Sequence, residues 1–280
     1  MKKMFAIVLA ALMVTALLAG CGSSTAETKA PETTAAPAPA TEAAAPAETE
    51  AAAPAFTTIE AGKLIMSTNA AFPPYEMVAD DGSFEGIDVE IAGAIAAKLG
   101  LELVVDDMDF DAALLAVQQG KSDIVMAGVT VNEDRKLVMN FSDTYSKGVQ
   151  VVIVKEGSDV TLDNLGDKMI GTQRGTTGYI YTSDDYGDDH VTAYDNGTSA
   201  VQALMNGQVD CVVIDSAPAE AFVEANPGLT ILDTEYTSED YAIGMSKDNT
   251  ALLDAVNAAL AELTADGTIP AIVEKYIPTK

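Results

Sequence analysis

Residues 86–100 read Gly-Ile-Asp-Val-Glu-Ile-Ala-Gly-Ala-Ile-Ala-Ala-Lys-Leu-Gly, a stretch that predicts an amphipathic helix between two strands. Asp88 is a candidate N-cap, and Gly100 is a typical residue just past a helix end. The apolar face recurs at helical spacing and consists of Ile91, Ile95 and Leu99. Short apolar runs at 64–67 and 102–105 flank it and predict strands. A helix that connects two strands favours a parallel sheet covered by helices.

The same alternation continues along the chain. Asp111 is a candidate cap for a helix over 112–119, and residues 124–127 predict the next strand. A second run of similar plan follows, with strands expected at 169–172, 191–194 and 211–214 and helices at 198–206 and 217–225. The chain is therefore predicted to fold as an α/β protein with two halves, each a mixed, mostly parallel sheet flanked by helices.

Two further apolar runs, 149–154 and 241–245, are expected to cross between the halves as antiparallel strands. Helices are predicted after them, at 248–264 and 268–276. On this reading one lobe comprises 56–150 together with 242–280, and the other comprises 151–241. Two lobes joined by two strands form a hinge, with a cleft lined by strand ends and helix N-termini, where small polar solutes bind.

The first 55 residues have two unusual compositions. Residues 1–20 have Lys2 and Lys3 before a short apolar run and predict a signal peptide. The run ends in Leu-Ala-Gly-Cys at 18–21, which resembles a bacterial lipobox and predicts lipidation of Cys21. A plain signal peptide or an anchor helix is the alternative. The rest of 21–55 is dominated by Ala, Pro, Glu and Thr and predicts a disordered tether.

Charge and residue counts exclude several classes of function. The 280 residues contain 43 Asp and Glu against 15 Lys and Arg, a net charge of −28 that argues against nucleic acid as a partner. Cys211 lies in a predicted buried strand and the single histidine, His190, in a polar loop, so no Cys/His pair is expected. The acidic cluster at 184–189 lacks calcium-loop spacing, so neither a metal nor a cofactor is predicted.

The chain has only two arginines, and both lie in strand-to-helix turns. Arg135 follows Thr130-Val-Asn-Glu133, where Thr130 and Glu133 have capping-box spacing and Asn132 is a competing cap. A guanidinium beside free backbone N–H groups suits a carboxylate ligand. A surface pair of Arg135 with Glu133 or Asp134 is the alternative. The second arginine, Arg174, stands in a turn from which its side-chain direction cannot be read.

Asp215 follows the strand predicted at 211–214 and precedes Ser-Ala-Pro. A carboxylate at the carboxyl end of a strand would face the cleft, where it suits an ammonium group. The same residue could instead be the N-cap of the helix that follows. The residues alone leave both readings open.

Several runs together resemble family 3 of the bacterial extracellular solute-binding proteins, the amino-acid receptors of ABC importers. The resemblance covers essentially all of 60–278, in order and at normal spacing. The runs that carry it are Gly-Ile-Asp-Val-Glu-Ile at 86–91, Ser-Thr-Asn-Ala-Ala-Phe-Pro-Pro-Tyr-Glu at 67–76, Gly-Val-Thr-Val-Asn-Glu-Asp-Arg at 128–135, Gln-Arg-Gly-Thr-Thr-Gly at 173–178 and Val-Ile-Asp-Ser-Ala-Pro at 213–218. It implies a two-lobed periplasmic-binding-protein-like (type II) fold.

The resemblance also implies a role for each matching residue. Arg135, Thr130 and the backbone of Thr177 would hold the ligand α-carboxylate. Asp215, with acceptors near Gly128, would hold the α-ammonium. The positions around the rest of the ligand are the sandwiching Phe72 and Phe110, the floor residue Ala127, and Asn69, Gln173 and Ile214 beside the ligand side chain. For the two phenylalanines, ordinary core packing is the alternative.

The amide of Asn69 bears on the ligand, because relatives that carry cationic amino acids often have an acid at that position. We therefore expect a neutral, polar amino acid. The expected protein is a monomeric, extracytoplasmic, lipid-anchored receptor that closes on a free amino acid and delivers it to an ABC permease in the cell membrane. Enzymes on the same scaffold, such as prephenate or arogenate dehydratases, and ligand-sensing domains are the alternatives. No catalytic motif favours an enzyme.

Overall fold

The structure is a computed structural model that describes residues 56–233 and 235–278. The predictions for the signal peptide, for Cys21 and for the tether fall outside the described residues. Within them the chain alternates between strands and helices, as the sequence predicts.

The first lobe is built on a parallel sheet in which the central strand β1 (Lys63–Thr68) pairs with β5 (Glu102–Asp107) and β6 (Ile124–Val125). Helices α1 (Ile87–Lys98) and α2 (Phe110–Gln118) connect these strands. A small antiparallel sheet of β2 (Ala71–Phe72), β3 (Glu76–Val78) and β4 (Phe84–Glu85) lies between β1 and α1 in the chain. The helix predicted within 86–100 is α1, and the strands predicted on either side of it are β1 and β5, so these three predictions are confirmed.

The predicted helix caps at Asp88 and Asp111 are wrong. Helix α1 begins at Ile87, after Gly86. Only glycine fits at position 86, because its φ is 126° and because a Cβ there would lie 2.3 Å from the backbone oxygen of Tyr75. Asp88 is fully buried and instead accepts a 2.9 Å hydrogen bond from the backbone N–H of Gly128. Helix α2 begins two residues earlier than expected, after Asp109, so that Asp111 lies in its first turn.

The second lobe repeats the plan with the parallel strands β10 (Cys211–Asp215), β8 (Ile170–Gln173) and β9 (Val191–Tyr194). Its helical elements are α4 (Thr177–Tyr186), α5 (Gly197–Met205), α6 (Ser216–Ala225) and the short turns η1 (Leu162–Asp167) and η2 (Asp188–His190). Strand β11 (Leu229–Ile231) pairs with the long strand β7 (Met139–Lys155).

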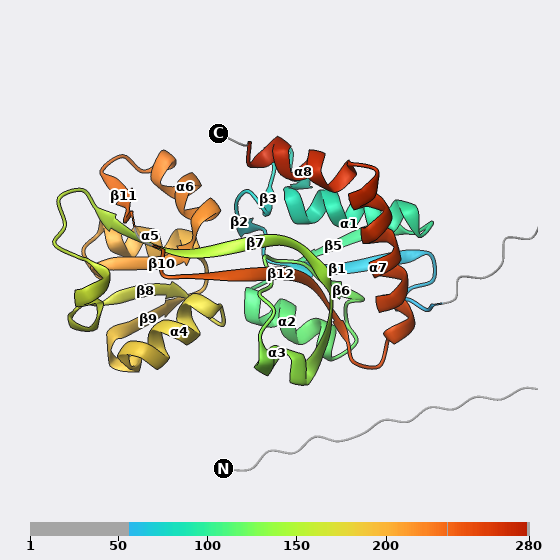
Figure 1. The fold of residues 1–280 in the computed structure, drawn as a ribbon, viewed down its shortest axis with the longest axis horizontal. Helices are drawn as coiled ribbons and strands as arrows, with labels where there is room; N and C mark the ends of the chain where they lie inside the picture. The colour runs from blue at the N-terminus through green and yellow to red at the C-terminus, as the bar shows by residue number, and fades with distance from the viewer. Residues whose placement is uncertain (1–55, 234, 279–280) are drawn as a thin grey trace, which may run out of the picture. The chain divides into compact units, whose positions relative to one another are not determined.

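Two long antiparallel strands, β7 (Met139–Lys155) and β12 (Thr237–Ser246), run between the lobes (Figure 1). Because β12 also pairs with β6 and β7 also pairs with β10, the sheets of both lobes join in the order β5-β1-β6-β12-β7-β10-β8-β9. Both crossing strands were predicted, but each is longer than expected. Helix α3 (Glu133–Val138) precedes β7, and α7 (Thr250–Ala265) and α8 (Thr268–Tyr276) follow β12 and pack on α1.

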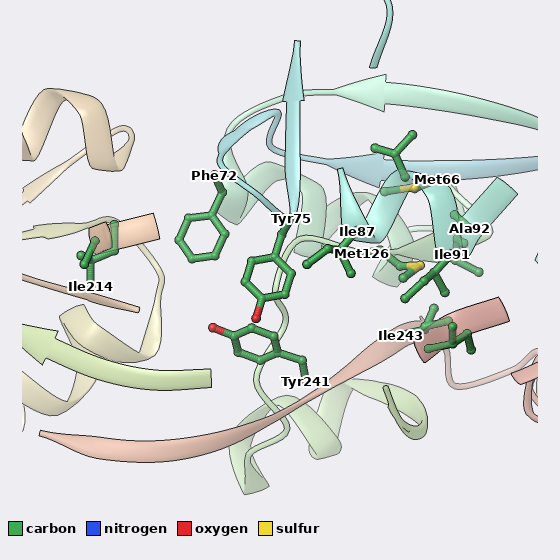
Figure 2. Packing of buried hydrophobic residues seen from close by; sticks show 14 of the residues in the cluster. Met66, Phe72, Tyr75, Ile87, Ile91, Ala92, Met126, Ile214, Tyr241 and Ile243 are labelled. Atoms are coloured by element: carbon green, nitrogen blue, oxygen red, sulfur yellow. The ribbon is translucent and has the colours of Figure 1, made fainter. Parts of the chain in front are cut away.

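The core continues from the first lobe to a hinge strand through a row of aromatic rings (Figure 2). Phe72 stacks on Tyr75 at 6.0 Å, and Tyr75 meets the ring of Tyr241 edge-on at 5.3 Å. Tyr241 comes from β12 and lies across Gly148 of β7, where a built Cβ would sit 2.4 Å from the ring. The hinge is therefore packed around one fully buried tyrosine.

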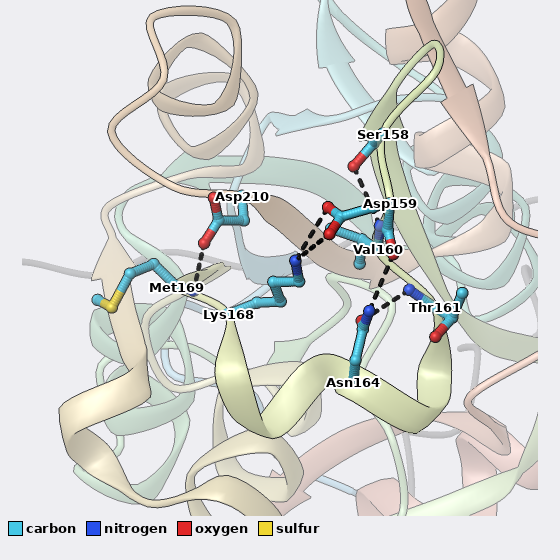
Figure 3. A network of polar contacts seen from close by, with 8 residues as sticks. All are labelled: Ser158, Asp159, Val160, Thr161, Asn164, Lys168, Met169 and Asp210. Carbon is cyan, nitrogen blue, oxygen red and sulfur yellow. Dashed lines mark hydrogen bonds and ion pairs between the residues drawn. The ribbon is translucent and has the colours of Figure 1, made fainter.

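A polar network fixes the η1 turn on the surface of the second lobe (Figure 3). Lys168 binds both oxygens of Asp159, at 2.9 and 3.0 Å, and Thr161 forms a capping box with Asn164. Asp210 accepts a 2.8 Å hydrogen bond from the backbone of Met169. These contacts are solvent-exposed, so we assign them to local structure.

No helix in 56–233 or 235–278 is long and apolar enough to cross a membrane. The same part of the chain holds no group of His, Cys, Asp or Glu residues arranged for a metal ion. Cys211 is buried in β10 and unpaired, and burial raises the pKa of its thiol to about 12, as for an inert core thiol.

Candidate functional site

A cavity lies where the carboxyl ends of the parallel strands of both lobes meet. Ten of the eleven residues that the sequence predicted for the site line it, all except Ile214, together with two that it did not predict. The lining consists of Asn69, Phe72, Glu76, Phe110, Ala127, Gly128, Thr130, Arg135, Gln173, Thr176, Thr177 and Asp215.

One end of the cavity is formed by Arg135, a buried arginine in α3 that is only 7% exposed. Its guanidinium donates to the carbonyl oxygens of Thr130 at 2.8 Å and Gly175 at 3.1 Å, and it lies 5.4 Å from the centre of the Phe110 ring. The predicted alternative of a surface ion pair is therefore wrong. Two of the five guanidinium N–H donors are used in these contacts, which leaves donors for a ligand carboxylate.

The sequence offered Thr130 and Asn132 as caps of the helix that contains Arg135, and the cap in the structure is Asn132. Asn132 accepts a 2.8 Å hydrogen bond from the backbone N–H of Arg135, whereas Glu133 pairs with Lys136 on the surface. Thr130 is consequently free of the cap, and its hydroxyl faces Thr177, the first residue of α4, at 3.4 Å. The N-terminus of α4 thus meets the Arg135 end of the cavity, where its dipole favours an anion.

The other end of the cavity is formed by Asp215, which is 7% exposed at the carboxyl end of β10. Asp215 is also the N-cap residue of α6, as the alternative predicted, but its side chain makes no cap hydrogen bond. The carboxylate accepts a 2.9 Å hydrogen bond from the Gln150 amide and another from the Tyr241 hydroxyl. Burial and, to a smaller extent, the charge of Glu239 raise the pKa of Asp215 to about 7, although both hydrogen bonds act to lower it.

Phe72 and Phe110 each line the cavity and also pack in the hydrophobic core. Phe72 lies against Gly128, where a built Cβ would come within 2.9 Å of its ring, and Phe110 lies below Arg135. Core packing and a position in the cavity wall, the two predictions made for these phenylalanines, are therefore compatible. Their rings give the cavity apolar walls between its two charged ends.

Asn69 and Gln173 meet across the cavity, one from each lobe. The side-chain amide of Gln173 donates a 3.0 Å hydrogen bond to the side-chain oxygen Oδ1 of Asn69, and the Nδ2 of Asn69 donates to the backbone carbonyl of Met108 at 2.9 Å. Ile214 is buried but does not line the cavity. Arg174 is exposed and pairs with Asp195 at 3.2 Å, so it is not part of the lining.

Sequence reasoning missed Glu76 and Thr176. Glu76 lies on β3 with 0% exposure, and neither carboxylate oxygen has a hydrogen-bond partner among the described residues. Burial, followed by the charge of the nearby Asp88, holds the pKa of Glu76 well above its usual range. The available signal was one acid beside apolar residues at the end of the run at 67–76. Thr176 caps α4 by accepting from the backbone of Tyr179.

These features define a class: two-lobed, hinged α/β proteins, here with a buried arginine and a buried aspartate in the lining of one cavity. A sequence model for "Bacterial extracellular solute-binding proteins, family 3" matches residues 64–279. The chain therefore belongs to that family, as its sequence motifs predicted, and the expected type II binding-protein fold is confirmed.

Known relatives bind amino acids of more than one chemical kind. The chain is 29% identical to "ABC transporter arginine-binding protein 1" of Escherichia coli K12, covering 80% of this chain and 94% of the relative. It is 30% identical to "L-cystine-binding protein TcyJ" of the same organism, covering 78% and 83%. Among solved structures, "An ancestral arginine-binding protein bound to glutamine" shares 39% identity with a TM-score of 0.74, covering 78% of this chain and 99% of the other.

Proposed function

We propose that this protein is the receptor of an ABC importer and that it encloses one free amino acid between its lobes. The observation that carries the proposal is the pair of buried, opposite charges in one cavity, Arg135 in the first lobe and Asp215 in the second. An α-amino acid presents a carboxylate and an ammonium group a few bonds apart. Each end would find its counter-charge, and the arrangement would discriminate against solutes that lack either group.

Binding would draw on residues from both lobes. Arg135 and the start of α4 at Thr177 supply donors to the carboxylate, which would lie beside Thr130, and Asp215 accepts from the ammonium. Phe72, Phe110, Ala127 and Gly128 form the walls. With lobes at 56–150 plus 242–280 and at 151–241, closure would be a hinge motion of β7 and β12. The closed monomer would then deliver its amino acid to the permease, outside the cytoplasm and held to the membrane by a lipid on Cys21.

The side chain of the ligand has two candidate classes. The amide of Asn69, where an acid would suit a cation, supports the predicted neutral, polar amino acid. Glu76 favours a second candidate, a cationic amino acid. After the ligand's α-groups are matched with Arg135 and Asp215, Glu76 remains as an extra buried carboxyl in the lining, and a cationic side chain would satisfy it.

A thermal-shift panel tests the proposal. Each of the proteinogenic amino acids and cystine is added to the purified protein, because a ligand at 100 times its dissociation constant stabilises a protein by about 2.7 kcal/mol. A response to Arg, Lys and His alone would select the cationic candidate, and a response to Gln, Asn, Ser or Thr would select the neutral one. A panel without any response would overturn the amino-acid proposal. Incubation with prephenate, analysed for product, tests the enzymatic alternative, for which we expect no turnover.

A further inference from the structure

Glu239 is a buried carboxylate of the hinge that the proposed ligand site does not use. It lies on β12, is 8% exposed and is not part of the cavity lining. One of its oxygens, Oε2, accepts hydrogen bonds from the Thr130 hydroxyl and from the Gln150 amide, both at 3.0 Å. The residue therefore connects the first lobe to both hinge strands.

Gln150 completes the connection to the second lobe. This residue of β7 is 1% exposed, and its amide nitrogen donates to Glu239 at 3.0 Å and to Asp215 at 2.9 Å. A side-chain amide has two N–H donors, so both are committed to carboxylates. Gly178 provides the space for this amide, since a Cβ at position 178 would lie 3.0 Å from the side-chain oxygen Oε1 of Gln150.

We propose that Gln150 and Glu239 form a positioning pair that fixes the orientation and ionisation of Asp215, and thereby the ammonium end of the proposed site. The two residues have opposite effects on the ionisation of Asp215. Gln150 donates to the Asp215 carboxylate and favours its charged form, whereas the negative charge of Glu239 disfavours a second charge nearby. Neither residue needs to touch the ligand. This inference rests on the proposed amino-acid site and deepens it.

The surroundings of Asp215 support this assignment. The titratable and charged groups that face it are Tyr241 and Glu239 on β12, Arg135 in α3, and Tyr75 and Glu76 near the aromatic row. Of the charged carboxylates, Glu239 is the one whose effect on the pKa of Asp215 is resolved, and Gln150 and Tyr241 are the side chains that donate to it. Substitutions of Gln150 and Glu239 are therefore expected to change the pKa of Asp215.

The test uses two variants that should shift the same titration in opposite directions. The affinity for the amino acid found in the ligand panel is measured by calorimetry from pH 5 to 9 in wild type, Glu239→Gln and Gln150→Leu. An ammonium group needs the ionised Asp215, so affinity should fall as the pH drops through the pKa of Asp215. We expect the midpoint to move down by about one pH unit in Glu239→Gln and up by about one unit in Gln150→Leu.

Asp240→Asn is the matched control, because it removes one negative charge from the next residue of β12, whose side chain is exposed and 3.8 Å from Lys147. Its midpoint should stay within about 0.3 pH unit of wild type, since an exposed charge is screened. Midpoints that move in the same direction in both hinge variants, or that do not move, would overturn the inference. General damage to the fold cannot mimic opposite shifts.

A second measurement separates this inference from the proposed function. The ionisation of Asp215 is followed in the ligand-free protein by carbon-13 NMR of side-chain carboxyls, with the signal assigned by its loss in Asp215→Asn. Opposite shifts in the two hinge variants would support the positioning pair even if no amino acid bound. Identical titrations in all three proteins would refute the pair even if amino acids bound tightly.

Discussion

The side-chain amide of Gln173 donates a 3.0 Å hydrogen bond to Asn69, and this contact joins the two lobes directly across the cavity. Asn69 also donates to the Met108 carbonyl, so both polar ends of its amide are engaged by the protein. A ligand side chain that used the Asn69 oxygen would have to share or displace Gln173. We infer that this pair contributes to closure of the lobes as well as to contact with the ligand.

Replacing Gln173 by Leu tests the contribution of this pair to closure. Loss of one interlobe hydrogen bond, worth about 0.5–1.5 kcal/mol, should weaken every amino-acid ligand by about 2- to 10-fold in calorimetry. Gln118→Leu, on the exposed side of α2, is the control and should leave affinity unchanged. A loss confined to ligands with a polar side chain would instead indicate that Gln173 acts by touching the ligand.

The two arginines of the chain form a natural pair of test and control. Arg135→Ala should remove the buried partner of the ligand carboxylate and cost about 2–5 kcal/mol of binding free energy, measured by calorimetry. Arg174→Ala removes an exposed arginine whose partner is Asp195, and it should bind like wild type. Equal affinities in wild type and Arg135→Ala would contradict the carboxylate role of Arg135.

The ammonium role of Asp215 predicts a dependence on ligand chemistry. Asp215→Asn should weaken an amino acid by about 10-fold or more, because a buried charge pair is lost, while its des-amino analogue should lose much less. Calorimetry with the two ligands measures the difference. Similar losses for both ligands would show that the substitution disturbs the cavity as a whole rather than the ammonium contact.

Glu76 predicts a distinction between cationic and neutral ligands. If the ligand is cationic, Glu76→Gln should reduce its affinity by about 10-fold or more and leave neutral amino acids nearly unaffected. The raised pKa of Glu76 also means that it must lose a proton to pair with a cation. Affinity for the cationic ligand should therefore increase with pH. Glu85→Gln, exposed on the paired strand β4, is the control, and cation affinity that survives Glu76→Gln would exclude Glu76 as the counter-charge.

The sequence predicted those parts of the fold and site that local pattern determines. The helix at 86–100 was recognised from its apolar spacing, and all of the ten predicted lining residues except Phe110 fall within or beside short runs whose residue types could be matched one by one. The strand β7 was predicted only at 149–154, because residues 139–148 are mixed in polarity. Their extended conformation is stabilised by pairing with β12, almost 100 residues away.

Asp88 and Glu76 show a second limit of sequence reasoning. Capping propensity made Asp88 a candidate helix cap, but its partner is the backbone of Gly128, 40 residues further along the chain. Glu76 was not selected at all, since an acid at the start of a short strand normally faces water. Only the three-dimensional arrangement reveals that both carboxyls are fully buried and close enough to influence each other's pKa.

The burial of Asp88 predicts how the stability of the folded protein depends on pH. One of its oxygens accepts from Gly128 and the other has no hydrogen-bond partner, and burial raises the pKa of Asp88 to about 6. The folded state therefore binds this proton more tightly than the unfolded state, in which the pKa is about 3.9. The resulting stability is fully present below pH 4 and is lost as the pH rises through 6, a change on the order of 2–3 kcal/mol.

Asp88→Asn should remove this dependence, because an amide is neutral at every pH and its oxygen can still accept from Gly128. Urea unfolding at pH 5 and pH 8, without ligand, measures it: wild type should lose stability between the two, and the variant should lose about 1.4 kcal/mol less. Asp80→Asn, which removes a carboxylate from an exposed turn, should follow wild type. If Asp88→Asn kept the full wild-type difference, the pH dependence would have to originate in the other buried carboxyls, Glu76 and Asp215.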